Sequence, residues 1–262
     1  KYSKKKLHLF VMLREEVVFG PIKSRRLGWS LGINLLPTKG KICNFDCIYC
    51  ECGWNADGRD DTKLPSAAEV RSALEAKLAD ILLEGTQVDS ITFSGDGEPT
   101  LNPDFARIID DTIALRDIYC PQAKVSVLTN ATKLHSDTVF GALRKVDAPI
   151  LKLDAPTDER ARKINGALPS FRVDDVVKGM KRFEGDFILQ TMFLKSDDFD
   201  SLEPQMLAKW MDIVREIRPR LIMAYTIARP TPQSGLSAYS AAQIREALKP
   251  LEDEGFKIQI NA

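Results

Sequence analysis

The stretch Cys43-Asn-Phe-Asp-Cys47-Ile-Tyr-Cys50 decides how the rest of this sequence is interpreted. Its three cysteines follow a C-x₃-C-x₂-C pattern directly after an apolar, strand-like run. This spacing brings three thiolates within reach of one metal centre and leaves a fourth corner without a protein ligand. Because a closed [4Fe–4S] cluster takes four cysteines, three cysteines predict a cluster with one iron open to a non-protein ligand.

Two other uses of the cysteines are structural zinc binding and redox chemistry. Structural zinc usually takes four Cys or His ligands. Cys52 is available as a fourth, but its single-residue spacing from Cys50 is tighter than zinc sites normally use, and the two histidines, His8 and His135, lie elsewhere in the sequence. A redox dithiol would need only the C-x-x-C pair Cys47 and Cys50. Neither use explains the motifs at the strand ends described below, so the cluster is the favoured interpretation.

The composition indicates an ordinary globular protein. The 262 residues are enough for one α/β barrel or two smaller domains, and 37 basic residues balance 37 acidic ones. A net charge of zero gives no overall field that would attract nucleic acid, so a nucleic-acid partner is not supported by charge. Five cysteines, three of them clustered, are typical of a metal site in a reducing cytosol. No apolar run approaches the roughly 20 residues of a membrane span, and we expect a cytoplasmic protein without a membrane partner.

The start of the chain is basic. Lys4-Lys5-Lys6 precede an apolar segment that stops at Arg14-Glu15-Glu16, and no small-residue cleavage site follows. We expect residues 1–16 to be a peripheral basic leader and residues 17–262 to form a single domain.

Apolar runs alternate with amphipathic stretches over the rest of the chain, which indicates βα units and a mostly parallel sheet. The expected fold is therefore α/β, a partial (β/α)₆ TIM-type barrel with the cysteine loop after its first strand. The six expected strands are Ser30–Leu36, Ser90–Ser94, Lys124–Thr129, Ile150–Asp154, Phe187–Leu194 and Arg220–Ile227, and a last short strand is Lys257–Ile260.

Helices are expected in the gaps between these strands. The clearest begins at Ser66, which forms a capping box with Glu69. The others are expected at about Pro103–Ile118, Ser136–Val146, Asp174–Phe183, Leu202–Ile217 and Ala241–Glu254.

Unusual residues gather where the expected strands end, which is the edge of βα architectures that carries active sites. Gly95 and Gly97 allow the main chain either to approach a ligand or to make a tight turn. Lys152 and Asp154 lie two apart and therefore on one face of their strand. They form either a structural ion pair or a contact to a cofactor.

The cysteine spacing, with an aromatic residue (Tyr49) before the last cysteine, resembles the signature of the radical S-adenosylmethionine (SAM) superfamily. Three further segments, Phe19–Gly28, Ser94–Leu101 and Lys152–Asp154, resemble the branch of short enzymes similar to wyosine-type tRNA-base synthases. The resemblance covers roughly residues 17–229. It implies a partial barrel and an oxidoreductase or lyase that reductively cleaves SAM at the cluster to a 5′-deoxyadenosyl radical, which removes hydrogen from a substrate that the sequence does not identify.

The resemblance also implies roles for individual residues. Cys43, Cys47 and Cys50 would hold the [4Fe–4S] cluster, and no other catalytic residue is implied. A segment like the Gly-Gly-Glu of the superfamily would bind the methionyl end of SAM, although Asp96 interrupts it here. The implied contacts to SAM are Tyr49, Gly95, Asp96, Gly97, Glu98, Asn130, Lys152, Asp154, Gln190, Tyr225, Thr226 and Ile227. The implied partner is a one-electron reductant of the flavodoxin or ferredoxin type.

Several positions keep two interpretations. Arg25 and Arg26 either grip a phosphate or carboxylate or form a solvated turn, while Arg229 is better placed to meet a substrate. Cys52 is either a filler or a thiol on the substrate side. Two other functions stay open: an activase that makes a glycyl radical on a partner protein, and a non-catalytic iron–sulfur or zinc protein. The Lys-x-Asp order at Lys152 reverses the Asp-x-Lys of typical activases.

Overall fold

The computed structural model describes residues 13–24, 26–58 and 61–262. Most of the expected basic leader and one expected substrate contact, Arg25, lie outside the described residues.

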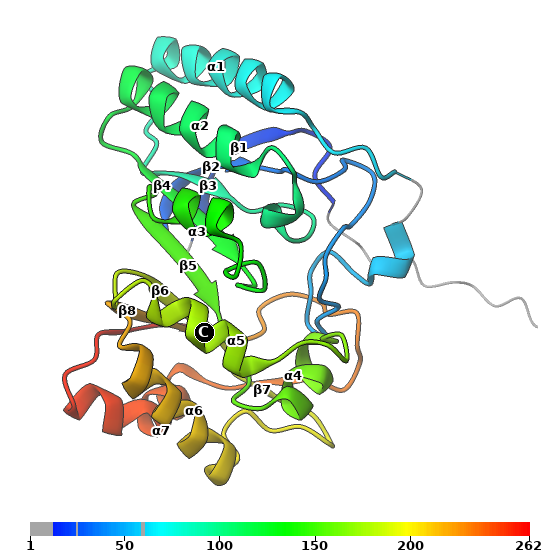
Figure 1. The fold of residues 1–262 in the computed structure, drawn as a ribbon, viewed down its shortest axis with the longest axis vertical. Helices are drawn as coiled ribbons and strands as arrows, with labels where there is room; N and C mark the ends of the chain where they lie inside the picture. Colours follow the sequence, from blue (N-terminus) through cyan, green and yellow to red (C-terminus); the bar gives the residue numbers. More distant parts are fainter. Residues whose placement is uncertain (1–12, 25, 59–60) are drawn as a thin grey trace, which may run out of the picture.

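The fold is built on one curled sheet of eight strands (Figure 1). Its order is β1-β2-β3-β4-β5-β6-β8-β10. The strands are β1 Val18–Ser24, β2 Gly28–Ile33, β3 Ser90–Phe93, β4 Lys124–Thr129, β5 Ala148–Lys152, β6 Ile188–Met192, β8 Leu221–Tyr225 and β10 Ile258–Asn261. All neighbouring pairs are parallel except β1 and β2, which form an antiparallel hairpin. The expected partial barrel, with β2, β3, β4, β5, β6 and β8 as its six parallel strands, is confirmed.

The sheet also corrects the sequence interpretation. Strand β1, which extends the sheet beyond β2, was not expected. The strand expected to reach Asp154 ends at Lys152, so Asp154 lies in the loop that follows β5. A separate two-stranded sheet pairs β7 (Leu194–Lys195) with β9 (Ser237–Ala238).

The helices follow the strands in the expected places. They are α1 Ala67–Glu84, α2 Phe105–Tyr119, α3 Asp137–Leu143, α4 Asp158–Asn165, α5 Val173–Lys181, α6 Pro204–Ile217 and α7 Ala241–Asp253, with short 3₁₀ turns at Asn55–Gly58 and Pro99–Leu101. The capping box of Ser66 and Glu69 at the start of α1 is present. Helix α4 was missed, and it proves important for the cysteine loop.

Strand composition explains the packing of the sheet. Every residue of β3 and of β6 is buried, as expected for strands that are covered on both faces. Residues two apart on a strand share a face. A small apolar cluster is formed by Ala148, Ile150, Ile188 and Met223. The residues two positions further along each strand, at the strand ends, therefore lie on the same face of the sheet as this cluster. A larger core fills the space on the other side of the sheet.

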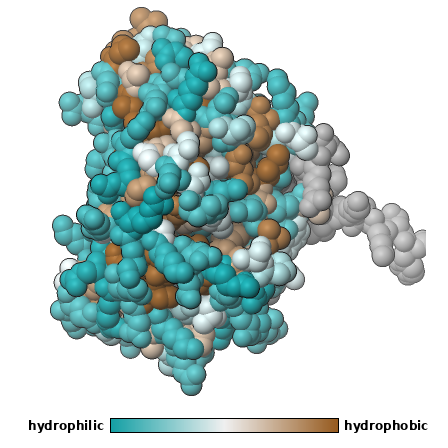
Figure 2. Space-filling model, viewed as in Figure 1, coloured by the Kyte–Doolittle hydropathy of each residue, from teal (hydrophilic) through white to brown (hydrophobic). Residues whose placement is uncertain are grey.

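The helices cover the outside of the sheet. In Figure 1, α1 and α2 pack side by side at one end of the molecule, and α6 and α7 lie at the other. Figure 2 shows the molecule from the same side as Figure 1, with hydrophilic side chains over most of the surface and apolar ones between them. Within the described part of the chain, no helix combines the length and apolar character needed to cross a membrane.

Candidate functional site at the carboxyl ends of the strands

A cavity of about 250 Å³ lies at the carboxyl ends of the parallel strands. Each of the six parallel strands, or the loop that directly follows it, contributes to its wall. The lining residues are Arg26, Lys41, Cys43, Phe45, Cys47, Tyr49, Cys50, Glu51, Cys52, Ser94, Gly95, Gly97, Glu98, Leu128, Thr129, Asn130, Lys152, Gln190, Met192 and Tyr225. The three clustered cysteines and most of the expected SAM contacts thus meet at one place.

The cysteine loop is held by the end of α4. The backbone N–H groups of Asp46 and Ile48 donate to the carbonyls of Asn165 and Ile164, at 2.7 and 3.0 Å. Gly166, in the left-handed conformation that ends the helix, lies so close that a Cβ atom there would meet the Asp46 carbonyl at 2.7 Å. The loop therefore has a fixed path that is set by a segment more than 100 residues later.

Two polar side chains brace the same loop from inside. Lys41 is 3% exposed, and its Nζ donates to Asp46 Oδ1 at 3.0 Å and to the Gly53 carbonyl at 2.6 Å. Burial opposes the charge of Lys41, but the negative groups of Cys50 and Asp46 outweigh it and raise the lysine's pKa. Asn55 Nδ2 donates to two carbonyls of the loop, at 3.0 and 2.9 Å.

All five cysteines are free thiols, and Cys43 and Cys47 have amide donors beside their sulfurs. Asn165 Nδ2 donates to Cys47 Sγ at 3.4 Å, and Asn130 Nδ2 lies 3.8 Å from Cys43 Sγ. Burial raises the pKa of Cys43 and of Cys47. Because metal ligands must be thiolates, binding a cluster here would release protons.

The donor set fits an iron–sulfur cluster better than one ion. Among the described residues, no three Cys, His, Asp or Glu side chains converge closely enough to hold a single metal ion. A cluster spreads its cysteine ligands over several irons, and three sulfurs around one side of a cavity match that requirement.

Cys52 lines the same cavity and lies close to Cys50, Gly95 and Asp96. The hydrogen bond from Cys52, together with the charge of Lys41, lowers the pKa of Cys50 to about 5. The Cys52 thiol also lies 3.9 Å from the Gly95 carbonyl and 3.7 Å from Asp96 Oδ1.

The glycines after β3 are required by the packing of the protein itself. A Cβ at Gly97 would lie 1.8 Å from the Ile42 carbonyl, and a Cβ at Gly95 would lie 2.1 Å from Asn34 Oδ1. The backbone of this segment pairs with the start of the cysteine loop, because Ile42 N donates to the Asp96 carbonyl and Glu98 N donates to the Ile42 carbonyl. Close backbone contact therefore explains both glycines, and both still line the cavity.

Glu98 joins the ends of β3 and β4. Its buried carboxylate accepts hydrogen bonds from Thr100 N, Thr100 Oγ1, Thr129 Oγ1 and Asn130 N, at 3.1, 2.6, 2.6 and 2.7 Å. Burial nevertheless raises the pKa of Glu98, against these four donors. Asn130 in turn donates to Asn44 Oδ1 at 2.6 Å, next to Cys43.

Lys152 forms an ion pair with Asp154 and also lines the cavity. Its Nζ donates to Tyr49 Oη at 2.6 Å and lies 3.7 Å from Asp154 Oδ2. Tyr49 donates to the same carboxylate, which also accepts a bond from Asn165 at 2.7 Å. Burial opposes the charge of Lys152, but Asp154 and neighbouring groups outweigh it and raise its pKa well above the usual value.

Four expected SAM contacts do not line this cavity. Asp96 is buried and accepts bonds from Arg14 N and Asn34 Nδ2, at 2.7 and 3.2 Å. Asp154 is buried, and its carboxylate is taken up by Lys152, Tyr49 and Asn165. Thr226 and Ile227 line a smaller adjacent cavity of about 50 Å³. The strand-end rule placed these residues at the right edge, but it could not tell which side chains turn inward.

Gln190 has a polar group that the described residues leave unpaired. The side chain is buried, lines the cavity and has no hydrogen-bond partner for Nε2. It stands opposite Lys152 in the parallel register of β5 and β6. A buried amide donor without an acceptor is costly, so a bound ligand with an acceptor atom would suit it.

Two arginines lie at the rim. Arg229 Nη1 forms an ion pair with Glu51 Oε2 at 2.5 Å. Arg26 lines both cavities and stacks over the Tyr225 ring at 5.1 Å. Among the described residues Arg26 has no ion-pair partner.

Sequence reasoning missed two of the residues that organise the site, Asn165 and Lys41. A signal for α4 was present: Thr157 is a helix N-cap residue, acidic residues follow it, and Gly166 ends the helix. No sequence signal connected Asn165 with Cys47 or Asp154. Lys41 gave no signal either, because a lysine in a loop is usually exposed.

Comparison with known proteins identifies relatives. A family model described as the radical SAM superfamily matches residues 38–203. The chain is 31% identical over 244 residues to a protein named GTPase Obg from Brachyspira hyodysenteriae, covering 92% of this chain and 34% of that protein. It is 28% identical over 219 residues to the UPF0026 protein MJ1312 of Methanocaldococcus jannaschii, covering 82% and 64%. The chain thus spans about a third and just under two thirds of the length of these relatives.

Solved structures share the fold. A radical SAM methyltransferase from Sphaerobacter thermophilus matches with a TM-score of 0.67 and 15% identity, covering 88% of this chain and 65% of that one. An archaeal TYW1 matches with a TM-score of 0.54 and 10% identity, covering 86% and 71%. These likenesses support the fold alone. The family uses a [4Fe–4S] cluster and SAM, and its members are enzymes. Since the family model covers well over half of the chain, this protein belongs to the radical SAM superfamily.

Proposed function

We propose that Cys43, Cys47 and Cys50 hold a [4Fe–4S] cluster and that this protein cleaves SAM to take hydrogen from a substrate. When bound, the cluster and SAM would supply the chemistry, namely one-electron cleavage of SAM to methionine and a 5′-deoxyadenosyl group that takes a hydrogen atom from the substrate. The protein's residues bind, orient and shield these groups.

One observation carries the proposal. The three cysteines face a single cavity together with the ends of all six parallel strands. This is the edge at which βα folds place their active residues. A loop that merely stored a metal at the surface would not need a buried lysine, a buried tyrosine and an unpaired buried glutamine around it.

The cavity offers matching groups for the polar parts of SAM. Lys152 is a partly buried cation that suits the carboxylate of an amino acid. Gln190 Nε2 is a free donor, and Asn130 places an amide beside Cys43. We propose these three as cofactor contacts, with the main chain at Gly95 and Gly97.

The arginines at the rim of the cavity favour a substrate with a negatively charged group. Arg26 faces the opening without an ion-pair partner among the described residues, and Tyr225 holds its guanidinium group in place. Guanidinium binds carboxylates and phosphates through paired hydrogen bonds. Arg229, already paired with Glu51, would contact the substrate only after that pair opens.

Anaerobic reconstitution with iron and sulfide tests the proposal. The wild-type protein should bind about four irons per chain and release 5′-deoxyadenosine when SAM and a reductant are added. Cys43→Ala, Cys47→Ala and Cys50→Ala should each lose the cluster. Cys120→Ala, a cysteine at the end of α2, is the matched control and should keep it.

Cys52→Ala separates the proposed cysteine assignment from its closest alternative. We expect this variant to keep both iron and 5′-deoxyadenosine release. Loss of the cluster from Cys52→Ala alone would mean that Cys52 is a ligand. A reconstituted wild-type protein that binds iron but never releases 5′-deoxyadenosine would contradict the proposed function.

A further inference from the structure

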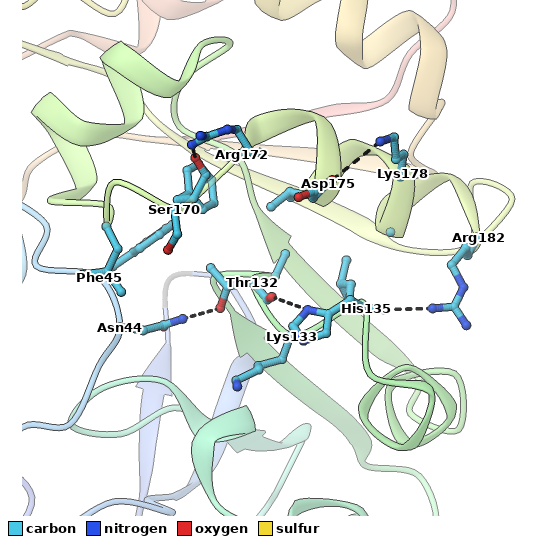
Figure 3. A pocket seen from close by; sticks show the side chains of 16 residues that line it. Asn44, Phe45, Thr132, Lys133, His135, Ser170, Arg172, Asp175, Lys178 and Arg182 are labelled. Atoms are coloured by element: carbon cyan, nitrogen blue, oxygen red, sulfur yellow. Dashed lines mark hydrogen bonds and ion pairs between the residues drawn. The ribbon is translucent and has the colours of Figure 1, made fainter.

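A second hollow, of about 460 Å³, lies beside the cysteine loop (Figure 3). Three segments that are distant in sequence line it: residues 44–45 of the cysteine loop, residues 131–135 after β4, and residues 168–182 around α5. Asn44 Nδ2 donates to Thr132 Oγ1 at 2.6 Å and ties the first two segments together. The proposed chemistry at the strand ends does not use this hollow.

Phe45 connects the hollow with the cluster cavity. Among the described residues it is the one side chain that lines both. Its ring packs edge-on against Phe171 on the hollow side, with ring centroids 5.3 Å apart. Cys43 and Cys47 lie two positions before and after Phe45 in the loop, and the backbone N–H of Phe45 donates to Cys43 Sγ at 3.4 Å. Phe45 therefore borders both the hollow and the cluster cavity.

The hollow is also basic. Four cations line it, Lys133, Arg172, Lys178 and Arg182, against one acid, Asp175. Figure 3 shows these groups around the opening.

Neighbouring acids offset some of this charge. Arg182 pairs with Asp137 at 2.6 Å, and Arg172 lies 3.6 Å from Asp158. Lys178 pairs loosely with Asp175 at 3.6 Å, and both side chains are largely exposed. Lys133 has no ion-pair partner among the described residues. The four cations thus have three acidic partners, and Lys133 leaves the hollow with one uncompensated positive charge.

In the proposed function, SAM and substrate would fill the cluster cavity, so a donor protein would approach the cluster from another side. The hollow reaches the cysteine loop at Phe45 and offers such an approach. Given the proposed function, we propose that an acidic one-electron donor protein of the flavodoxin or ferredoxin type docks on this hollow and passes its electron across Phe45. One electron leaves the donor and enters the cluster, and no bond is made or broken.

Charge reversal tests the docking. In the reconstituted protein, Lys133→Glu combined with Lys178→Glu should slow reduction of the cluster by fully reduced flavodoxin. We expect the second-order rate constant to fall at least about tenfold at low salt, because complementary charge speeds association by factors of about 10 to 1,000. The difference should shrink as added salt screens the charges. Stopped-flow absorbance of the cluster is the readout.

Two controls make the result specific. Lys124→Glu combined with Lys257→Glu changes the net charge equally, using exposed lysines at the amino ends of β4 and β10. It should react with flavodoxin within twofold of wild type. Reduced methyl viologen, a small cationic donor, should reduce the Lys133/Lys178 variant no more slowly than wild type.

The outcomes separate the two proposals. A protein whose cluster neither donor reduces would contradict the proposed function and the docking site with it. Normal reduction by viologen, with an unchanged flavodoxin rate in the Lys133/Lys178 variant, would overturn the docking site alone. An unchanged flavodoxin rate with lost affinity for a short RNA would instead make the hollow a nucleic-acid surface.

Discussion

Glu98 gives the sharpest test of how the site is held together. Its carboxylate is 2% exposed and accepts four hydrogen bonds, two of them from the backbone N–H groups of Thr100 and Asn130. The other two come from the hydroxyls of Thr100 and Thr129. Removing the carboxylate leaves two buried N–H groups without an acceptor, whereas the hydroxyls can rotate toward other acceptors.

The cost of Glu98→Ala follows from these contacts. Two unsatisfied buried N–H groups cost about 1 to 3 kcal/mol each, or about 2 to 6 kcal/mol together. The substitution also removes the cost of burying a charged carboxylate, and this gain offsets part of the loss. We therefore expect a loss of about 3 kcal/mol in the free energy of unfolding, a large part of the 5 to 15 kcal/mol typical of a domain.

Urea unfolding of the cluster-free protein measures this loss. The matched control Glu216→Gln breaks an exposed ion pair with Lys181 and should cost less than about 1 kcal/mol. A change below about 1 kcal/mol in Glu98→Ala would refute the idea that Glu98 anchors the ends of β3 and β4.

The pH dependence of Glu98 adds a second measurement. Burial raises its pKa in the folded protein above the unfolded value of about 4.3. The folded state thus binds the proton more tightly, so this contribution to stability is complete below that pH and is lost as pH rises through the folded pKa. Glu98→Gln cannot titrate. The stability of wild type relative to this variant should therefore fall as pH rises above about 4.3, and a constant difference would contradict the assignment.

Two further substitutions test the brace around the cysteine loop. Asn165→Ala removes the donor to Cys47, and iron release to a chelator should become about 10 to 100 times faster, as is usual when a partner of a metal ligand is lost; release at the wild-type rate would count against that role. Lys41→Met leaves Asp46 and the Gly53 carbonyl without their buried cation, and urea unfolding of the cluster-free protein should show a loss of about 3 kcal/mol. Lys41→Arg, which keeps the charge, should lose less, and equal losses in the two variants would show that the fit of the side chain matters more than its charge.

The sheet could be predicted from the sequence because its signals are local. Strands such as β3 and β6 are short, fully buried runs rich in apolar and β-branched residues. Parallel pairing in chain order then follows from the helices between them. Strand β1 escaped this reasoning because Gly20 and Pro21 interrupt its apolar pattern, and it pairs as an irregular antiparallel hairpin.

The sequence predicts at which end of the strands the candidate site lies, but not which side chains face it. Lys152 and Gln190 belong to inward-facing positions of neighbouring strands, and both line the cavity. Asp96 and Thr226 lie at the same edge but bond to the protein's own backbone. Sequence order places a residue at an edge, while the direction of its side chain beyond the strand depends on loop geometry.

What stayed hidden are contacts between segments distant in the chain. Asn165 and Cys47 are 118 positions apart, and no local pattern says that one donates to the other. The same holds for Phe45 and Phe171, whose rings pack edge-on where both line the basic hollow. Both contacts depend on α4 and the segment that follows it, which hold the cysteine loop from outside the barrel. If the docking proposal is right, one outer layer has two tasks: it fixes the loop that binds the cluster, and it forms the surface through which the cluster is reduced. Substitutions in that layer should therefore separate into two groups, with Asn165 affecting retention of iron and Lys133 affecting only the rate of reduction.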